Sequence, residues 1–181
     1  MNLPNLISLA RLLVTPVAVW LMLTGAMTAA FWVFLAAAVS DALDGLIAKR
    51  FDRVTVLGAY LDPLADKALL VSVYVVLGML DKLPLWLVLL VVFRDILIIG
   101  GALLLWLHAR SFRMRPLMVS KVNTTAQIVL AAAVLAVEGL GLPLDAAVQP
   151  LVYAVAATTL ISGASYLAGW LRSMAQAEAG E

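Results

Sequence analysis

Four aspartates lie in two closely spaced pairs within otherwise apolar sequence. Asp41 and Asp44 are three residues apart, and Asp62 and Asp66 are four residues apart. On an α-helix either spacing puts both side chains on one face. If the two segments are antiparallel neighbours, the pairs can converge into one cluster of four carboxylates. Such a cluster needs cations, and its hard oxygen ligands favour one or two ions of Mg²⁺, Mn²⁺ or Ca²⁺; two such ions can clamp a phosphate and its leaving group.

Two of the aspartates also have a purely structural interpretation. Asp62 precedes Pro63, which is typical of a helix N-cap followed by proline at the first helical position, and Asp41 could belong to a loop. Lys67 and Arg50 are too few to neutralise four carboxylates. Small residues nearby would let a ligand or another helix approach closely: Gly45, Ala48 and Gly58. Because all four aspartates fall on two adjacent segments, we favour a functional cluster.

The composition indicates an integral membrane protein. Of the 181 residues, 65% are hydrophobic and only 13% are charged, which is too apolar for a small soluble domain or a disordered chain. A net charge of +1 gives no electrostatic basis for binding nucleic acid. The chain has no cysteine, which excludes disulfides, thiolate catalysis and cysteine-based zinc sites. No charge occurs between Arg11 and Asp41 or between Asp145 and Arg172, so each run can cross a bilayer as a helix.

The apolar runs predict an all-α integral membrane protein with six transmembrane helices. They are expected at residues 5–24, 28–50, 57–80, 84–108, 118–138 and 146–172. The runs are continuous rather than alternating, which argues against a β-barrel. We expect one catalytic domain over residues 1–174, followed by a polar, fraying tail at 175–181.

Basic residues concentrate in two of the expected connections: Lys49, Arg50 and Arg53 in one, and Arg110, Arg113, Arg115 and Lys121 in the other. The connections near Gly25 and between Glu138 and Asp145 have none, and the third has only Lys82. With six spans, this asymmetry places both termini and both basic connections in the cytoplasm. A signal peptide is the competing interpretation of the first helix, but its start is polar rather than basic.

The spacing of the aspartate segment carries a family resemblance. In order it reads Asp41-x2-Asp44-Gly45-x2-Ala48-Lys49-x8-Gly58-x3-Asp62-x3-Asp66. This resembles the D-x2-D-G-x2-A-R-x8-G-x3-D-x3-D signature of the CDP-alcohol phosphatidyltransferases, with seven of eight fixed positions matched. The departure is Lys49, which supplies a point charge where the family usually has the bidentate fork of arginine.

The resemblance implies a reaction and a set of roles. A hydroxyl of an acceptor alcohol attacks the β-phosphorus of a CDP-linked lipid such as CDP-diacylglycerol, and CMP leaves. Carried over to this sequence, the four aspartates hold two Mg²⁺ or Mn²⁺ ions, and Asp66 is also the base that takes the acceptor proton. The CDP pocket would be lined by Asn5, Ser8, Gly45, Ala48, Lys49 and Gly58. The fold implied is the six-helix core of the family.

The acceptor is less well defined. Candidate acceptor-binding residues are Arg94, Arg115 and Lys121, with Arg113 equally well explained by the positive-inside rule. Arg94 begins a long apolar run, so we expect it to have an inward partner such as Asp95 or a phosphate. Members of the family that use glycerol 3-phosphate carry a second arginine two turns further on, where this chain has Gly101-Ala102-Leu103. This favours phosphatidylglycerol as the acceptor, although the spacing from Arg94 to Lys121 is closer to that of the glycerophosphate group.

Other expectations and alternatives remain at this point. The resemblance implies a homodimer in the inner membrane of a bacterium, with the active site facing the cytoplasm. His108, the single histidine, is expected at the membrane interface rather than in catalysis. A small cation transporter or channel lined by the same aspartates is the main alternative, but helices five and six carry no matching acidic cluster. A diphosphate-binding prenyltransferase is a further one, although its aspartate spacing differs.

Overall fold

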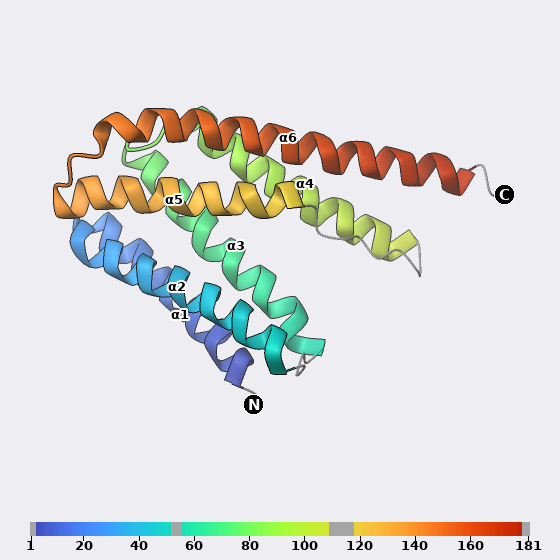
Figure 1. Ribbon diagram of the computed structural model, residues 1–181, viewed down its shortest axis with the longest axis horizontal. Helices are drawn as coiled ribbons and strands as arrows, with labels where there is room; N and C mark the ends of the chain where they lie inside the picture. Colours follow the sequence, from blue (N-terminus) through green and yellow to red (C-terminus); the bar gives the residue numbers. More distant parts are fainter. Residues whose placement is uncertain (1–2, 52–55, 109–117, 179–181) are drawn as a thin grey trace.

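The computed structural model describes the backbone of residues 3–51, 56–108 and 118–178, and the side chains of residues 10–41, 67–101 and 118–171. Within these ranges the chain is entirely helical (Figure 1), which confirms the predicted class. The helices are α1 (Leu3–Leu23), α2 (Met27–Phe51), α3 (Val56–Met79), α4 (Leu85–His108), α5 (Met118–Leu140) and α6 (Asp145–Glu178).

The predicted helices agree with the structure except at the end of the chain. We expected the last helix to stop at residue 172 and the tail from residue 175 to fray, whereas α6 continues to Glu178. The added segment, Ser173-Met174-Ala175-Gln176-Ala177-Glu178, is rich in residues with high helix propensity. Polarity alone therefore misplaced the end of this helix, because a polar segment can continue a helix beyond its apolar part.

Three tight turns connect α1 to α2, α3 to α4 and α5 to α6. Each contains one residue in the left-handed region: Gly25 with φ 78°, Asp81 with φ 56° and Gly141 with φ 65°. In the first turn the Ala26 amide donates to the carbonyl of Leu21 at 2.8 Å, and in the second the Lys82 amide donates to Leu77 at 2.8 Å. These bonds satisfy carbonyls that the end of a helix leaves free.

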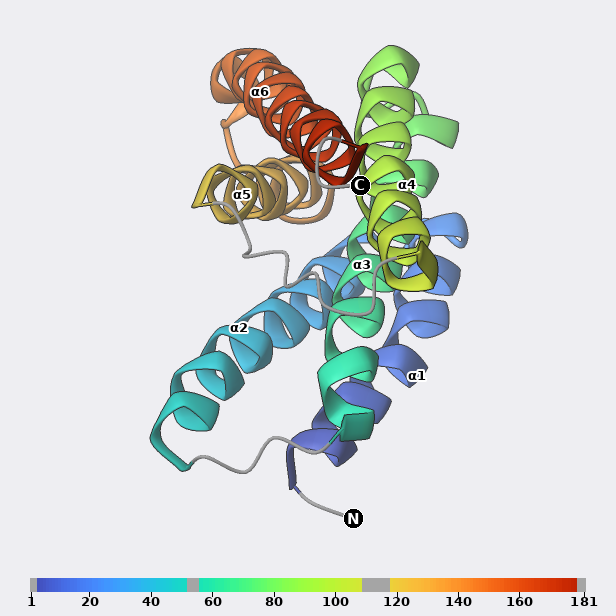
Figure 2. The same cartoon turned by 90° about the vertical axis from the view of Figure 1, so that its right-hand side faces the viewer.

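The molecule has one closed end and one open end. The three tight turns gather at the closed end, while the other ends of the helices spread apart (Figures 1 and 2). The beginnings of α1 and α3 lie side by side at the open end in both views, whereas Figure 2 shows the end of α2 at the same level but apart from them. The polar motif of the sequence falls on these helix ends, so the fold brings its segments to the same part of the molecule.

Gly139 permits a close contact between α2 and α5 at the closed end. A Cβ at this position would lie 2.7 Å from the carbonyl carbon and oxygen of Met27 and 2.8 Å from the amide nitrogen of Thr28. The Thr28 hydroxyl donates to the carbonyl of Gly139 across the same contact. Only glycine fits here, because any side chain would overlap with the backbone of α2.

All six helices contribute buried apolar residues to one core, and α6 packs on α5 and α4. Tyr74 is fully buried, and its hydroxyl donates to the backbone carbonyl of Gln127 at 3.0 Å, joining α3 to α5. The outer surface is rich in large apolar side chains: Trp20, Trp32, Leu85, Leu89, Phe93, Ile96 and Tyr153 are among the exposed ones. A surface of this kind is typical of a protein that faces lipid or a partner.

Two helical segments are long and apolar enough to cross a membrane by length and composition, within the residues that the structure describes. They are Met118–Leu140 and Asp145–Leu171. Shorter apolar segments occur at Ala10–Leu23, Met27–Asp41 and Lys67–Met79. The fold is therefore all-helical with at least two membrane-capable helices, and the six predicted spans remain a prediction.

Candidate functional site

Asp41, the first aspartate of the motif, is held by an arginine of a different helix. Arg11 of α1 is buried, and its Nη1 lies 2.6 Å from Oδ1 of Asp41 on α2. The side chain of Asp41 keeps 41% of its surface exposed. Its carboxylate is therefore both oriented by Arg11 and accessible from outside, which suits a ligand of a hard cation such as Mg²⁺ or Mn²⁺.

The other three aspartates lie in helical backbone, and their side chains fall outside the described residues. Asp44 lies within the bounds of α2, and Asp62 and Asp66 lie within those of α3. Since α3 begins at Val56, Asp62 is not the N-cap of this helix, and the purely structural interpretation of that aspartate is wrong. Among the described side chains no group of three or more His, Asp or Glu residues could hold one metal ion, so convergence of all four aspartates remains a prediction.

The expected CDP-binding residues lie on the same three helix ends. Asn5 and Ser8 are in the first turns of α1; Gly45, Ala48 and Lys49 are near the end of α2; and Gly58 is in the first turn of α3. Their side chains also lie outside the described residues. The backbone places these positions at the open end of the bundle, where the aspartate positions lie (Figure 2).

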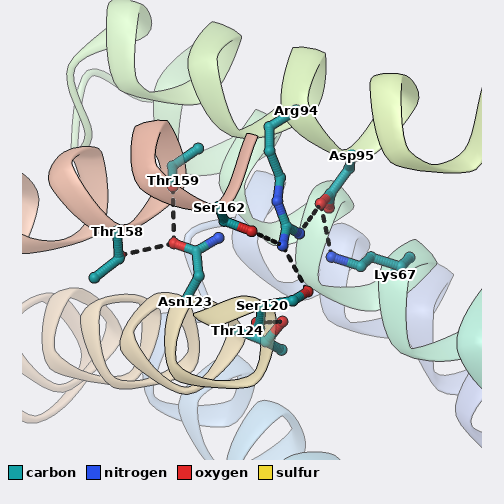
Figure 3. A network of polar contacts seen from close by, with 9 residues as sticks. All are labelled: Lys67, Arg94, Asp95, Ser120, Asn123, Thr124, Thr158, Thr159 and Ser162. Atoms are coloured by element: carbon teal, nitrogen blue, oxygen red, sulfur yellow. Dashed lines mark hydrogen bonds and ion pairs between the residues drawn. The ribbon is translucent and has the colours of Figure 1, made fainter. Parts of the chain in front are cut away.

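A second polar centre lies between α3 and α4 (Figure 3). Oδ1 of Asp95 accepts hydrogen bonds from Nζ of Lys67 and from Nη1 of Arg94, each at 2.7 Å. Asp95 and Arg94 are each 3% exposed, and the Lys67 side chain is 25% exposed. Lys67 follows Asp66 directly in the sequence, so this centre is adjacent in α3 to the end of the motif. The expected inward partner of Arg94 is thus confirmed as Asp95.

The Arg94 guanidinium also reaches the two C-terminal helices. Its Nη2 donates to Ser120 Oγ of α5 at 2.7 Å and to Ser162 Oγ of α6 at 2.6 Å. Nε of Arg94 and Oδ2 of Asp95 are buried without a hydrogen-bond partner among the described residues. These two atoms retain unused hydrogen-bonding capacity that a polar ligand or water could satisfy.

The polar centre continues along α5 as a seam of buried side chains. Oδ1 of Asn123 accepts hydrogen bonds from the hydroxyls of Thr158 at 2.8 Å and Thr159 at 2.9 Å, both on α6 (Figure 3). Asn123 and Gln127 are 0% exposed and lie one turn apart. Through the Asn123 hydrogen bonds, α5 and α6 contact each other by polar as well as apolar groups.

Two of the expected acceptor-binding residues, Arg94 and Lys121, differ in their burial. Arg94 is buried in the polar centre, whereas Lys121 is exposed and makes no ion pair within the described side chains. Ser120, its neighbour, is the residue of α5 that contacts Arg94. Arg113 and Arg115 lie outside the described residues, as does the side chain of His108.

Sequence reasoning missed the partners of Lys67 and Arg11. Lys67 was considered only as a neutraliser of the motif aspartates, yet it pairs with Asp95. Arg11 was considered as the boundary of an uncharged run, but not as the counter-ion of Asp41. The charged residues within the apolar segments could have been recognised as a group, because buried charges in such segments need partners. They are Arg11, Lys67 and Asp95.

Comparison with known proteins adds a decisive observation: the profile of the CDP-alcohol phosphatidyltransferase family matches residues 1–166. The chain belongs to this family. It is 36% identical to the cardiolipin synthase (CMP-forming) / mitochondrial hydrolase fusion protein of Schizosaccharomyces pombe, over 91% of this chain and 30% of that protein. It is 35% identical to the chloroplastic CDP-diacylglycerol–glycerol-3-phosphate 3-phosphatidyltransferase 1 of Oryza sativa subsp. japonica, over 92% of this chain and 56% of that protein.

A bacterial relative is matched over most of its length. The CDP-diacylglycerol–glycerol-3-phosphate 3-phosphatidyltransferase of Bacillus subtilis is 32% identical over 74% of this chain and 76% of that protein. The chain spans only part of the S. pombe and rice proteins. The relatives include a protein named as a cardiolipin synthase and proteins named as glycerol-3-phosphate phosphatidyltransferases, so family membership by itself does not select the acceptor.

Proposed function

We propose that the chain is a membrane-embedded, divalent-metal-dependent phosphatidyltransferase. It moves a phosphatidyl group from CDP-diacylglycerol to an acceptor alcohol and releases CMP. The observation that carries the proposal is the aspartate motif of this family, whose two halves lie on the last part of α2 and the first part of α3, both at the open end of the bundle. A cation transporter is less well supported, because a transport pathway would not require the glycine, alanine and lysine positions of the motif.

The reaction is a displacement at phosphorus. The acceptor hydroxyl oxygen forms a bond to the β-phosphorus of CDP-diacylglycerol, the bond from that phosphorus to the bridging oxygen breaks, and CMP leaves with the oxygen. Asp66 takes the proton of the hydroxyl as the bond forms. Asp41, Asp44, Asp62 and Asp66 would hold two Mg²⁺ or Mn²⁺ ions, which supply charge neutralisation for the diphosphate. Arg11 keeps the Asp41 carboxylate in one orientation for this role.

The nucleotide would lie against the small residues of the motif. Gly45, Ala48 and Gly58 leave room for close approach of the diphosphate to helix backbone. Lys49 offers a single positive charge to a phosphate oxygen rather than a bidentate pair of hydrogen bonds. Asn5 and Ser8, near the beginning of α1, supply hydrogen bonds on the nucleotide side.

The acceptor would approach from the side of the polar centre. Lys67, Arg94 and Asp95 carry two positive charges and one negative charge, so the group has a net charge of +1 and attracts an anion. Arg94 can offer its Nε–H, since its other two nitrogens already donate to Asp95, Ser120 and Ser162. Arg115 and Lys121 would act at the entrance to this side.

We propose phosphatidylglycerol as the preferred acceptor, with glycerol 3-phosphate second. Gly101 stands where an additional arginine would bind the phosphate of a small soluble acceptor. The test is a panel of purified reactions with CDP-diacylglycerol and glycerol 3-phosphate, phosphatidylglycerol, inositol phosphate or serine, with the products resolved by mass. Cardiolipin as the main product supports the preference. Phosphatidylglycerophosphate as the main product reverses it, and no CMP release with any acceptor overturns the phosphatidyltransferase proposal.

The helix lengths and the basic residues support a membrane arrangement with the site on the cytoplasmic side. At about 1.5 Å per residue, Lys67 and Asp95 lie about 15 to 20 Å along their helices from the α3–α4 turn, within the ~30 Å thickness of a hydrocarbon core. Asp62 lies about 26 Å from that turn and so near the opposite surface. The basic connections adjoin this same side, which supports a site and both termini in the cytoplasm of a bacterium, with six spans in its inner membrane.

The absence of cysteine makes this topology directly testable. A thiol reagent that does not cross membranes should label Lys82→Cys in intact cells, and should label Ser111→Cys only after lysis. The reverse pattern would place the site on the outer side of the membrane.

A homodimer through α3 and α4 is also part of the proposal. The outer face of α4 exposes Leu89, Phe93 and Ile96, and Gly100 and Gly101 have open space around them. Small residues of this kind allow close packing of helices within a membrane. Cross-linking between cysteines introduced at Gly100 in two copies would support this interface, and a strictly monomeric protein in nanodiscs would contradict it.

A further inference from the structure

Asp95 is the junction of the buried charge network. One of its oxygens, Oδ1, accepts from both Lys67 and Arg94, and the carboxylate is almost completely removed from solvent. Arg94 extends the network to Ser120 and Ser162 (Figure 3). Four helices, α3 to α6, are thus joined through charged and hydroxyl groups at a single level of the bundle.

The contact with Lys67 is the part of this network that concerns α3. Lys67 is the residue after Asp66, and successive positions on a helix are about 100° apart around its axis. The Lys67–Asp95 pair therefore holds one side of α3 toward α4 at the level where the motif ends, whereas the buried apolar residues of α3 lie further along the helix. A rotation of about 20° would move a carboxylate about 6 Å from the axis by about 2 Å, and displacements of about 1 Å can reduce a rate ~100-fold.

We propose that Asp95 is a positioning residue of the transfer reaction, acting through Lys67 to set the rotation of α3. This inference rests on the proposed function. The alternative is that Asp95 only balances the charge of two buried cations. In that case any second substitution that restores the charge balance should also restore activity. The two roles separate when charge balance and the contact are changed independently.

The chain offers variants that make this separation. Asp95→Asn removes one negative charge and raises the net charge of the group from +1 to +2. The double variant Lys67→Met with Asp95→Asn returns the net charge to +1, but it removes the ion pair. Lys67→Met alone leaves a neutral Arg94–Asp95 pair and also removes the link to α3. The matched control is Lys82→Met with Glu138→Gln, which deletes a second ion pair of 2.7 Å at the closed end of the bundle.

The measurements are the melting temperature in detergent, the rise in that temperature on adding Mn²⁺ alone, and kcat and KM for CMP release. We expect Lys67→Met and the double variant to melt within a few degrees of the wild type. Both should have kcat reduced about ten- to a hundredfold and a smaller stabilisation by Mn²⁺. The effects of the two substitutions on kcat should not multiply, because they break the same contact. The control pair should keep the wild-type kcat and the wild-type response to Mn²⁺.

Recovery of kcat and of the Mn²⁺ response in the double variant would overturn the positioning role and leave charge balance as the explanation. A wild-type kcat in Lys67→Met would overturn it as well. If the wild-type protein itself released no CMP, the proposed function would fail instead. The Mn²⁺ response of the same variants would still report whether Asp95 and Lys67 orient α3.

Discussion

Arg11 on α1 and Asp41 on α2 form an ion pair of 2.6 Å in which the cation is buried and the carboxylate remains 41% exposed. The first aspartate of the motif is therefore oriented by a residue outside the motif. Thr15, one turn further along α1, donates to the backbone carbonyl of Arg11 at 3.1 Å. The pair joins α1 and α2 on the side of the molecule where the remaining aspartate positions lie.

Replacing Arg11 should therefore weaken both the fold and the site. We expect Arg11→Met to lower the free energy of unfolding by about 1 to 2 kcal/mol. This is less than the 3 to 5 kcal/mol of a fully buried pair, because water still reaches Asp41. Thermal unfolding in detergent measures the loss, with Arg11→Lys as the variant that keeps the charge and should lose less. Equal stability of the wild type and Arg11→Met would show that the pair contributes nothing.

The contact between α2 and α5 predicts a strong effect of the smallest change at Gly139. Gly139→Ala places a Cβ about 0.7 Å too close to the backbone of Met27, judged against ordinary contacts of 3.4 Å or more, so α5 must move away. We expect a loss of about 1 to 3 kcal/mol.

The control for this substitution is Gly169→Ala in α6, where an added Cβ meets nothing within 4 Å. In a helix this change should be neutral or stabilise by about 0.4 to 1 kcal/mol. Melting temperatures of the two purified variants in the same detergent provide the comparison. Similar temperatures for both would mean that α2 and α5 are not in close contact at Gly139.

The proposed base makes a distinct prediction for Asp66. Asp66→Asn keeps the size of the side chain but cannot accept the proton, so CMP release should fall by about 10² to 10⁴-fold while the protein stays folded. Asp81→Asn, in the turn at the closed end, is the matched control and should keep the wild-type rate. Near-wild-type turnover by purified Asp66→Asn would assign the base to another group.

The positions of the helices were predictable from the sequence because each helix is determined mainly by the residues within it. Runs without charge located the helices, and Gly25 and the Gly139–Pro143 segment marked two of the turns. The end of α6 was the exception, since helix propensity in the tail outweighed its polarity.

The ion pairs were less predictable because they depend on how helices cross. Arg94 and Asp95 are neighbours in sequence, and their pairing was expected from the apolar context. Lys67 and Asp95 are separated by 28 residues, and their contact requires a particular rotation of α3 against α4. Hydropathy and spacing define which face of a helix is polar, but they do not define which charge on another helix it meets.

The most direct test of the account is the number of metal ions that the protein binds through the four aspartates. Titration of purified protein with Mn²⁺, followed by electron paramagnetic resonance in the presence of CDP-diacylglycerol, should give about two ions per chain. Each of Asp41→Asn, Asp44→Asn, Asp62→Asn and Asp66→Asn should weaken the binding at least about tenfold, while Asp81→Asn should leave it unchanged. Full Mn²⁺ binding by all four variants would contradict a shared site at the ends of α2 and α3.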